Sequence, residues 1–459
     1  SRQSRGLGDV YKRQYIDRER DRIHVVERIN GKREYREYPA NYVFYYDDPR
    51  GKHKTIYETP VSRFSTRNRK EFQKEIKIQG HKGLYESDIN PVFRCLEENY
   101  LNAEPPKLQT AFFDIEVDFH KEKGYSNPDD PFNAITAISI YLDWSEQLVT
   151  LAIPPSAMTM ETAKDLCKRF DNTYLFTSEA EMLKVFLDLI EDADILSGWN
   201  SEGYDIPYTV NRITRVLSKD DTRKFCLFKQ LPKKRTFERF GKESVTFDLV
   251  GRVHLDYMQL YRKYTYEERH SYTLDAIGEY ELEERKVQYE GTLDQLYNQD
   301  FEKFIDYNRQ DTLLLNKLDK KLRFIDLSNV LAHENTVLLM TTMGAVAVTE
   351  QAIINDAHAR GMVVPNRKNR DGEQTTAAGA YVAYPKKGLH DWIGAIDINS
   401  LYPSVIRALN MGPETVVGQL RQTMTNNAVR TLMASKKSFA DAWEGEFGSR
   451  EYQAVMSME

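Results

Sequence analysis

The chain has 459 residues, enough for about three domains of roughly 150 residues each, and 41% of them are hydrophobic, which can fill several cores. Its 64 Lys and Arg against 70 Asp and Glu give a net charge of −6, so the chain is not basic throughout and any nucleic-acid footprint must be local. The three cysteines, Cys95, Cys167 and Cys226, form no Cys-x-x-Cys pair. They support neither a zinc site nor a disulfide framework and fit a reducing cytoplasm.

The two ends of the chain differ from the rest. Residues 1–14 begin without Met and are basic without periodicity, so we interpret them as a leader that is not native to the protein. The last residues, "SREYQAVMSME", stop inside a helix-like pattern with neither a cap nor a Gly. We therefore expect a fragment of a longer protein.

The pattern from 15 to 105 is mostly that of strands and predicts a β-rich N-terminal domain. Two alternating runs, "RIHVVERI" and "KREYREYP", are separated by Asn30 and Gly31, which predicts a hairpin with a type I′ turn. A basic stretch and a helical pattern around "PVFRCLEENYL" follow. The consecutive prolines of "NAEPPK" (102–107) break both periods and indicate a linker.

From 106 to 325 strand and helix patterns are interleaved, which predicts an α/β domain whose mixed sheet is covered by helices. The predicted strands are "AFFDIEV", "ITAISIYL", "QLVTLAI" and "ILSGWN", and the predicted helices are "SEAEMLKVFLDLIED" and "PYTVNRIT". A hairpin is expected over 237–247 with Gly241 at its turn, and a helix over 300–322 closes the domain.

The remainder is expected to form a helical connection over 326–370, packing on the N-terminal domain, and a new core over 371–459. The most apolar run, 337–348, is too short and too rich in Thr to span a bilayer, so we predict a buried helix there. "WIGAIDI" (392–398) predicts a buried strand that begins an α+β domain.

The strand "AFFDIEV" carries two acids, Asp114 and Glu116, in an otherwise apolar run. Side chains alternate across a strand, so both project from one face. Two carboxylates about 4 Å apart repel by roughly 4 kcal/mol at an effective dielectric of about 20, so a cation should compensate them. The alternative is an edge strand whose acids meet solvent or a lysine.

Two further segments add acids to this pair. Asp205 follows a Gly-flanked loop at a strand end; alone, it is typical of a helix N-cap with Pro207 in the first turn. Tyr307 and Asp311 are four residues apart on a helical face that points at the core, where an acid is costly unless paired and a lone Tyr is ordinary packing. Four acids from a strand, a loop and a helix suit two divalent cations roughly 3.5–4 Å apart.

"FDIEV", "GWNSEGYDIPY" and "YNRQDTLL", in this order, resemble the three exonuclease motifs of family B DNA polymerases, especially the tailed-phage branch. The resemblance implies an RNase H-like 3′→5′ proofreading domain. It gives Asp114, Glu116, Asp205 and Asp311 as ligands of two Mg²⁺ or Mn²⁺ ions and Tyr307 as a residue that places the attacking water. Asn200 would orient the scissile region, although an Asn at a strand end is as often a turn residue.

"DINSLYPSVIR" (397–407) resembles the first polymerase motif of the same family. By itself Asp397 is typical of a strand-end cap. The resemblance implies that Asp397 binds the two catalytic Mg²⁺ ions, and that the backbone N–H groups of Ser400, Leu401 and Tyr402 cradle the incoming triphosphate. Tyr402 would also exclude a 2′-OH by sterics. Neither the fingers motif nor an Asp-Thr-Asp-Ser strand occurs in the printed residues, so we expect both beyond Glu459.

"LPKKRTFERF" (231–240) joins four basic residues to two Phe, which suits phosphate contacts and base stacking. The candidate DNA-binding residues are Lys233, Lys234, Arg235 and Phe237. A solvated charged hairpin is the alternative. By resemblance, this hairpin would help to move the primer end between the two sites.

The sequence therefore indicates a viral DNA-directed DNA polymerase with proofreading activity, in the cytoplasm of an infected bacterium. Its expected partners are primer-template DNA, single-stranded DNA, dNTPs and a sliding clamp bound through a part outside this chain, with no membrane. One alternative is a stand-alone two-metal exonuclease, against which "DINSLYPSVIR" argues because a nuclease needs no deoxynucleotide gate. The other is a non-enzymatic nucleic-acid scaffold, whose acids would bind no paired metal ions.

Overall fold

The computed structural model describes residues 13–17, 21–239, 242–367, 383–412 and 415. The chain divides into two compact units. The first contains residues up to Tyr46 and from Arg63 to Arg360, and the second contains residues 47–62 and those from Gly361 onward.

The predicted N-terminal hairpin is confirmed. Strands β1 (Arg13–Asp17), β2 (Arg22–Ile29) and β3 (Lys32–Pro39) form an antiparallel sheet with β2 in the centre. Asn30 and Gly31 have φ values of 50° and 76°, the left-handed conformation that both central residues of a type I′ turn require.

Further N-terminal elements pack on one another through aromatic side chains. They are β4 (Tyr42–Asp47), β6 (Pro60–Thr66), α1 (Arg69–Gln79), β7 (Leu84–Tyr85) and α2 (Pro91–Tyr100). Asn68 and Asn90 cap the two helices, each accepting N–H groups of the first turn. Phe72 of α1 contacts the rings of Tyr42 and Phe44 on β4, which partly covers one side of the helix.

The centre of the first unit is a mixed six-stranded sheet, as predicted. Its strands in spatial order are β11 (Thr173–Leu175), β10 (Gln147–Ala152), β9 (Ile135–Leu142), β8 (Thr110–Val117), β12 (Ile195–Gly198) and β15 (Val253–Asp256). The β8–β9 and β9–β10 pairs are antiparallel and the others are parallel. The central position of β8 buries both of its faces.

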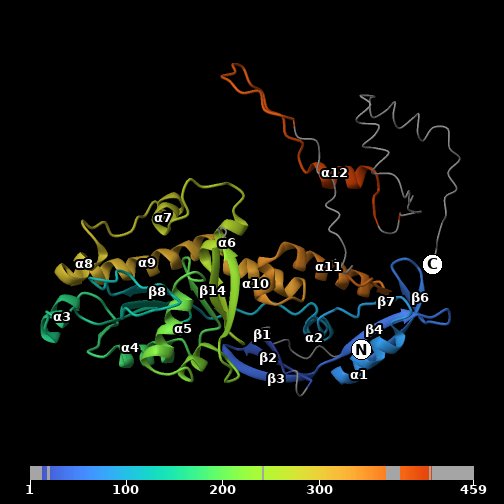
Figure 1. Ribbon diagram of the computed structural model, residues 1–459, viewed down its shortest axis with the longest axis horizontal. Coiled ribbons are helices and arrows are strands. Elements are labelled where there is room, and N and C mark those ends of the chain that lie inside the picture. The colour runs from blue at the N-terminus through green and yellow to red at the C-terminus, as the bar shows by residue number, and fades with distance from the viewer. Residues whose placement is uncertain (1–12, 18–20, 240–241, 368–382, 413–414, 416–459) are drawn as a thin grey trace. The chain divides into compact units, whose positions relative to one another are not determined.

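Alternation along β8 decides which helices meet which side chains. Phe113 and Ile115 belong to a core with α4 (Glu179–Leu189) and α5 (Asp205–Val216). Phe112 faces the other way, into a core with the long helix α9 (Phe301–Leu322), which packs across β8, β9 and β10 (Figure 1). Asp114 and Glu116 share the parity of Phe112, so the strand aims both acids at α9.

The other helices of the first unit surround this sheet. They are α3 (Met160–Cys167), η1 (Asp221–Phe225), α6 (Tyr257–Tyr264), α7 (Leu274–Leu282), α8 (Leu293–Gln299) and α10 (Phe324–Glu334). The expected hairpin consists of β13 (Lys233–Arg239) and β14 (Lys242–Asp248), which pair antiparallel and begin earlier than the sequence pattern indicated. Gly241 lies outside the described residues.

The prediction of one buried helix over 337–348 is wrong. A 3-10 helix, η2 (Leu339–Met343), ends at Gly344, and α11 (Ala345–Ala359) begins after it. Gly344 has extended backbone, and the Thr342 hydroxyl donates to the Leu339 carbonyl at 2.6 Å, which favours the tight turn over a continuous helix. Val346 is 82% exposed, so the apolar run divides between core and surface.

In the second unit, β5 (His53–Thr55) pairs antiparallel with the start of β6 and parallel with β16 (Met362–Val363). Helix α12 (Leu401–Ala408) follows later. The predicted buried strand over 392–398 is wrong, because this segment is irregular and its apolar side chains, including Trp392 and Ile396, are exposed. A strand forms only with a hydrogen-bonding neighbour, and among the described residues no strand pairs with this one.

Candidate active site

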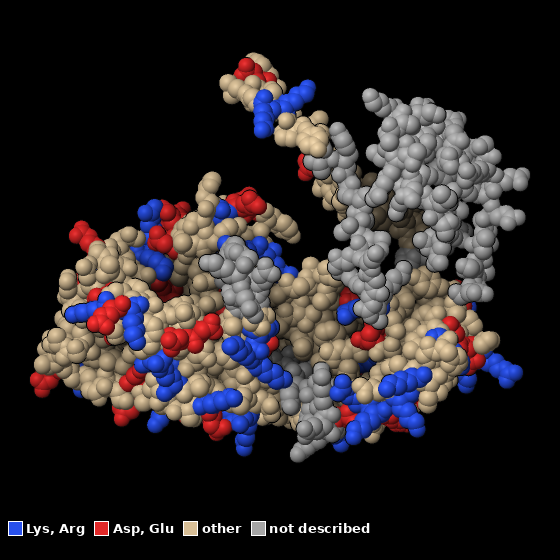
Figure 2. Space-filling model, in the orientation of Figure 1, with Lys and Arg blue, Asp and Glu red and all other residues tan. Residues whose placement is uncertain are grey.

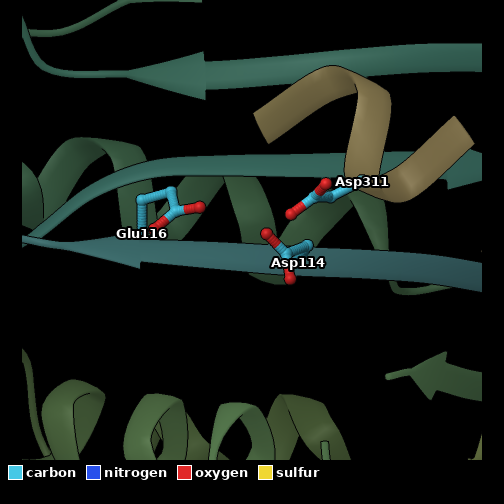
Figure 3. Close-up of side chains that lie close together, drawn as sticks. All are labelled: Asp114, Glu116 and Asp311. Atoms are coloured by element: carbon cyan, nitrogen blue, oxygen red, sulfur yellow. The ribbon is translucent and has the colours of Figure 1, made fainter. Parts of the chain in front are cut away.

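Three of the predicted acids meet between β8 and α9. Asp114 and Glu116 project from the strand and Asp311 from the helix, and one carboxylate oxygen of each lies within 4.8 Å of the others (Figure 3). Glu116 is 8% exposed and Asp311 is 3% exposed, so water screens their charges poorly. The structure thus brings together three of the four predicted acids, from segments almost 200 residues apart in the sequence.

Burial and mutual repulsion disfavour the charged forms of these acids. Burial, followed by the charges of Glu116, Asp311 and Asp205, raises the pKa of Asp114 well above its ordinary value. Burial and the charge of Asp311 raise the pKa of Glu116 to about 8. The carboxylates can be ionised together at neutral pH only if cations are close.

Lys286 supplies one such cation, and the sequence analysis missed it. Its Nζ lies 2.5 Å from Asp311 Oδ2 and donates to the Tyr307 hydroxyl at 3.3 Å. Burial alone would lower the lysine pKa, but the charges of Asp311, Tyr307 and Asp114 hold it above its ordinary value. Lys286 lies after α7 in an irregular segment, so neither helical nor strand periodicity could identify it as a site residue. The sequence analysis predicted only that some cation must compensate the paired acids.

Asp205 approaches the cluster from the start of α5. It is 5% exposed, and its carboxylate accepts the Ile115 N–H of β8 at 3.4 Å. Tyr204 occupies the N-cap position, so Asp205 is the first residue of the helix and not the cap that its sequence context suggested. Burial raises its pKa to about 7 although backbone N–H groups stabilise the ionised form. Asp205 lies beside the three-acid cluster without joining it.

Helix α9 contributes two more polar side chains to this face. The Tyr307 hydroxyl accepts from Lys286, as described, and the ring makes an edge contact with Tyr289. The Asn308 side chain, which is fully buried, donates from Nδ2 to Asp114 Oδ2 at 3.0 Å. Sequence reasoning missed Asn308, although its spacing of three residues from Asp311 places both on one helical face.

Asn200 lies in the loop between β12 and α5. Its φ of 62° is left-handed, and its backbone N–H donates to the carboxylate of Asp256 at 3.0 Å. This geometry is that of a turn residue, the alternative that the sequence left open. A role in orienting the scissile region stays a prediction.

The basic hairpin residues differ in their surroundings. Lys233 and Lys234 are exposed, whereas Arg235 pairs with Asp248 at 2.9 Å and with Glu202 at 2.6 Å. The Phe237 side chain lies outside the described residues. On the face shown in Figure 2, basic side chains lie near the base of this hairpin and over α1, with acidic ones interspersed.

The predicted polymerase residues belong to the second unit. Asp397 is exposed in the irregular segment before α12, and Ser400, with a φ of 50°, is the N-cap of that helix. Leu401 and Tyr402 form its first turn, and Tyr402 is 72% exposed. The expected turn into a helix is therefore present, while the roles of these residues stay predictions.

The cluster in the first unit fits a divalent cation. Carboxylate oxygens are the ligands that Mg²⁺ and Mn²⁺ prefer. Asp311 Oδ1 is buried and has no hydrogen-bond partner among the described residues. A buried acceptor without a donor costs roughly 1–3 kcal/mol, and a bound metal ion would remove that cost.

Family comparisons agree with this geometry. Residues 61–277 match the family model described as "DNA polymerase family B, exonuclease domain". Residues 335–445 match the model described as "DNA polymerase family B", so the two matches together span most of the chain. The chain belongs to family B of the DNA polymerases. The first match contains Asp114, Glu116 and Asp205, and the second contains Asp397.

Similar curated proteins from two phages and from Thermococcus litoralis are named as DNA polymerases. A "DNA-directed DNA polymerase" of Escherichia phage RB69 is 26% identical over 90% of this chain and 47% of its own length. The enzyme with that name from Enterobacteria phage T4 is 28% identical over 54% of this chain and 27% of its own length. A "DNA polymerase" of Thermococcus litoralis is 26% identical over 74% of this chain and 19% of its own length. The chain thus spans half or less of the length of these relatives.

None of the helices in the described part of the chain has the length and apolar content needed to cross a bilayer.

Proposed function

We propose that this chain removes nucleotides from a DNA 3′ end in a metal-dependent reaction and so provides the proofreading activity of a phage-type replicative polymerase. The cluster of Asp114, Glu116 and Asp311, with Asp205 beside it, carries the proposal. Buried carboxylates gathered from a strand and two helices cost stability, and metal binding is a function that requires such an arrangement.

The four acids would hold two Mg²⁺ or Mn²⁺ ions. When bound, such a pair activates a water molecule and stabilises the leaving oxygen of a phosphodiester. Two positions are supported over one because Asp205 lies outside the three-acid cluster and has its own backbone contact to Ile115.

Lys286 and Tyr307 complete the site in this proposal. The ammonium holds the Tyr307 hydroxyl at 3.3 Å and neutralises Asp311, so the hydroxyl is fixed beside the acids. Burial raises the pKa of Tyr307 above its ordinary value, so the hydroxyl stays protonated and can donate or accept a hydrogen bond. A protonated phenol in this place suits the orientation of a water molecule at the scissile phosphate.

For the whole protein, the family supports templated DNA synthesis, with primer-template DNA and dNTPs as substrates. Asp397 would bind the Mg²⁺ ions of that site, and the N–H groups of Ser400 to Tyr402 the triphosphate. The phage relatives support action in the cytoplasm of an infected bacterium. A sliding clamp completes the set of proposed partners.

The test is digestion of a single-stranded oligonucleotide labelled at its 5′ end by purified 1–459 in Mg²⁺. Asp114→Ala combined with Glu116→Ala should slow shortening from the 3′ end by roughly 10²- to 10³-fold or more, because metal-held charge stabilisation is lost. The matched control is Glu161→Ala with Asp165→Ala, which removes two exposed acids from α3 and should leave the rate unchanged. A double variant of the cluster that digests DNA as fast as the parent would refute the proposal.

A further inference from the structure

The loop that leads into Asp205 has an unusual conformation and an unusual set of anchors. It runs over residues 199–204, between the end of β12 and the start of α5. Asn200 is left-handed, with a φ of 62°. A Cβ on Gly198 would lie 2.7 Å from Ser201 Cβ and 2.9 Å from the carbonyl oxygen of Phe113 on the neighbouring strand, so the loop folds back tightly onto the end of β12.

The main anchor is the Asp256 carboxylate at the end of β15. β15 runs parallel to β12 with Asp256 opposite Gly198, so the carboxylate faces the loop. Oδ1 accepts the Asn200 N–H at 3.0 Å and Oδ2 accepts the Glu202 N–H at 3.2 Å. Oδ1 also accepts the Met258 N–H at 3.0 Å, which caps α6. Asp256 is 5% exposed, so these bonds are made largely out of water.

Two side-chain contacts hold the same loop. Ser201 and His254, both buried, are joined by a 2.8 Å hydrogen bond between Oγ and Nε2. His254 and Asp256 are two residues apart on β15 and so point to the same face. Glu202 is held from the hairpin side by Arg235 at 2.6 Å. Asn200, Ser201 and Glu202 of the loop therefore each have their own anchor, which leaves the loop backbone little conformational freedom.

We infer that Asp256 is a positioning residue for the nuclease site: it fixes the loop and thereby places the Asp205 carboxylate where a metal ion needs it. The inference rests on the function proposed above. The hydrogen bonds of the Asp256 carboxylate described above go to backbone N–H groups and not to the three-acid cluster. We assign it no contact with the substrate. Asp205 depends on such support because, in the described part of the chain, a single side-chain hydrogen bond, from the Ile115 N–H, ties it to β8.

Asp256→Asn tests the inference because the side chain keeps its size and one oxygen. The new amide nitrogen cannot accept a hydrogen bond, so at least one loop N–H loses its partner. Loss of a partner that orients a metal ligand typically weakens metal affinity or activity about 10- to 100-fold. We expect Mn²⁺ to bind more weakly by this factor in calorimetry, and kcat on single-stranded DNA to fall while KM stays within about twofold.

Two readouts separate positioning from general destabilisation. Hydrogen exchange in EDTA should accelerate at the Asn200 and Glu202 amides of Asp256→Asn while the β8 amides stay protected. Excess Mn²⁺ should restore much of the rate to Asp256→Asn but not to Asp205→Ala. The matched control is Asp319→Asn, which alters a partly buried carboxylate that accepts a backbone N–H, that of Ile325, away from this loop. It should leave Mn²⁺ affinity unchanged.

Asp256→Ser is a second variant in case Asp256→Asn does not fold. Its hydroxyl can still cap α6, but it is too short to reach the N–H groups of the loop. It should reproduce the Mn²⁺ effect of Asp256→Asn. Parent-like Mn²⁺ affinity and kcat in both variants would overturn the inference while leaving the proposed nuclease intact. If the Asp114→Ala and Glu116→Ala variant also digests DNA normally, the proposed function itself has failed.

Discussion

Asp311 has two different environments on one carboxylate. Oδ2 lies 2.5 Å from the Lys286 ammonium, whereas Oδ1 is buried with no hydrogen-bond partner among the described residues. One lysine cannot neutralise Asp114, Glu116 and Asp311 together, and burial and the charge of Asp311 still raise the pKa of Glu116 to about 8. The negative charge of the acids at this site thus exceeds the positive charge that Lys286 supplies, and a bound metal ion would provide the rest.

Lys286→Met should destabilise the metal-free protein more than the metal-bound one. Without the ammonium, the buried acids repel one another, and we expect a loss on the order of 2 kcal/mol in EDTA. Saturating Mn²⁺ replaces the missing charge, so the melting temperature should return close to that of the parent. Differential scanning calorimetry in both buffers measures this.

Lys317→Met, which breaks the half-exposed pair with Glu284, is the control and should cost under about 1 kcal/mol in either buffer. Equal losses for Lys286→Met in both buffers would contradict the role given to Lys286.

Tyr307→Phe should slow single-stranded DNA digestion by about tenfold without abolishing it. A hydroxyl that orients water contributes less to the rate of cleavage than a carboxylate that holds the metal ions. Single-turnover rates at saturating Mg²⁺, compared with those of Asp311→Ala, test this directly. A loss as large as that of Asp311→Ala would mean that Tyr307 is essential to the site rather than an aid to orientation.

Among the elements, those with a local pattern were predictable from the sequence and those that depend on distant partners were not. Asn30 and Gly31 fixed the β2–β3 turn because only a left-handed pair closes it. Alternation in 111–117 placed Asp114 and Glu116 on one face, and the helical spacing of Tyr307 and Asp311 aimed them at the core. These local patterns account for most of the site.

The failures have physical causes. Apolar content in 337–348 and 392–398 predicted burial, but burial depends on what packs there: Gly344 divides the first segment, and no described strand pairs with the second. Lys286 and Asp256 escaped detection because their importance comes from tertiary contacts with Asp311 and with the loop before Asp205.

Helix α11 is tied to the N-terminal elements by a histidine whose contribution should depend on pH. His358 donates to Glu97 Oε1 at 2.7 Å and to Glu86 Oε1 at 2.9 Å. Burial alone would lower its pKa, but the hydrogen bonds and charges of Glu86 and Glu97 raise it to about 9. The folded state thus holds a proton that an unfolded histidine, with its pKa of 6.5, releases more readily.

The stabilisation from His358 should be complete below pH 6.5 and disappear as the pH rises through about 9. The melting temperature of the parent should therefore be higher than that of His358→Gln, and this difference should be largest near pH 6 and vanish by about pH 10. Thermal melts from pH 6 to 10 measure the gap, with the same change at exposed His81 as the control. A gap that stays constant over this range would contradict the ion-paired state of His358.

At the scale of the whole molecule, the two units differ in how their elements are supported. β8 is central in a six-stranded sheet with cores on both faces. α12 has eight residues, none of them buried. Isolated helices shorter than about 12–15 residues are marginal in water, so α12 gains little stability of its own.

Hydrogen exchange should reveal this contrast. Amides of 111–116 should exchange orders of magnitude more slowly than those of 401–408, because opening β8 requires disruption of the central sheet. Exchange followed by mass spectrometry on purified 1–459, without DNA, measures both segments in one experiment. Comparable protection would show that α12 is packed in solution and would contradict its exposure.

If the acids on β8, α5 and α9 form a two-metal site, titration of the EDTA-stripped chain with Mn²⁺ in a calorimeter should reveal two bound ions. The parent should bind two ions at this site, and both should be lost when Asp114→Ala is combined with Glu116→Ala, while the Glu161→Ala and Asp165→Ala control should bind as the parent does. Absence of paired binding in the parent, or a cluster variant that still binds two ions with unchanged affinity, would contradict the account.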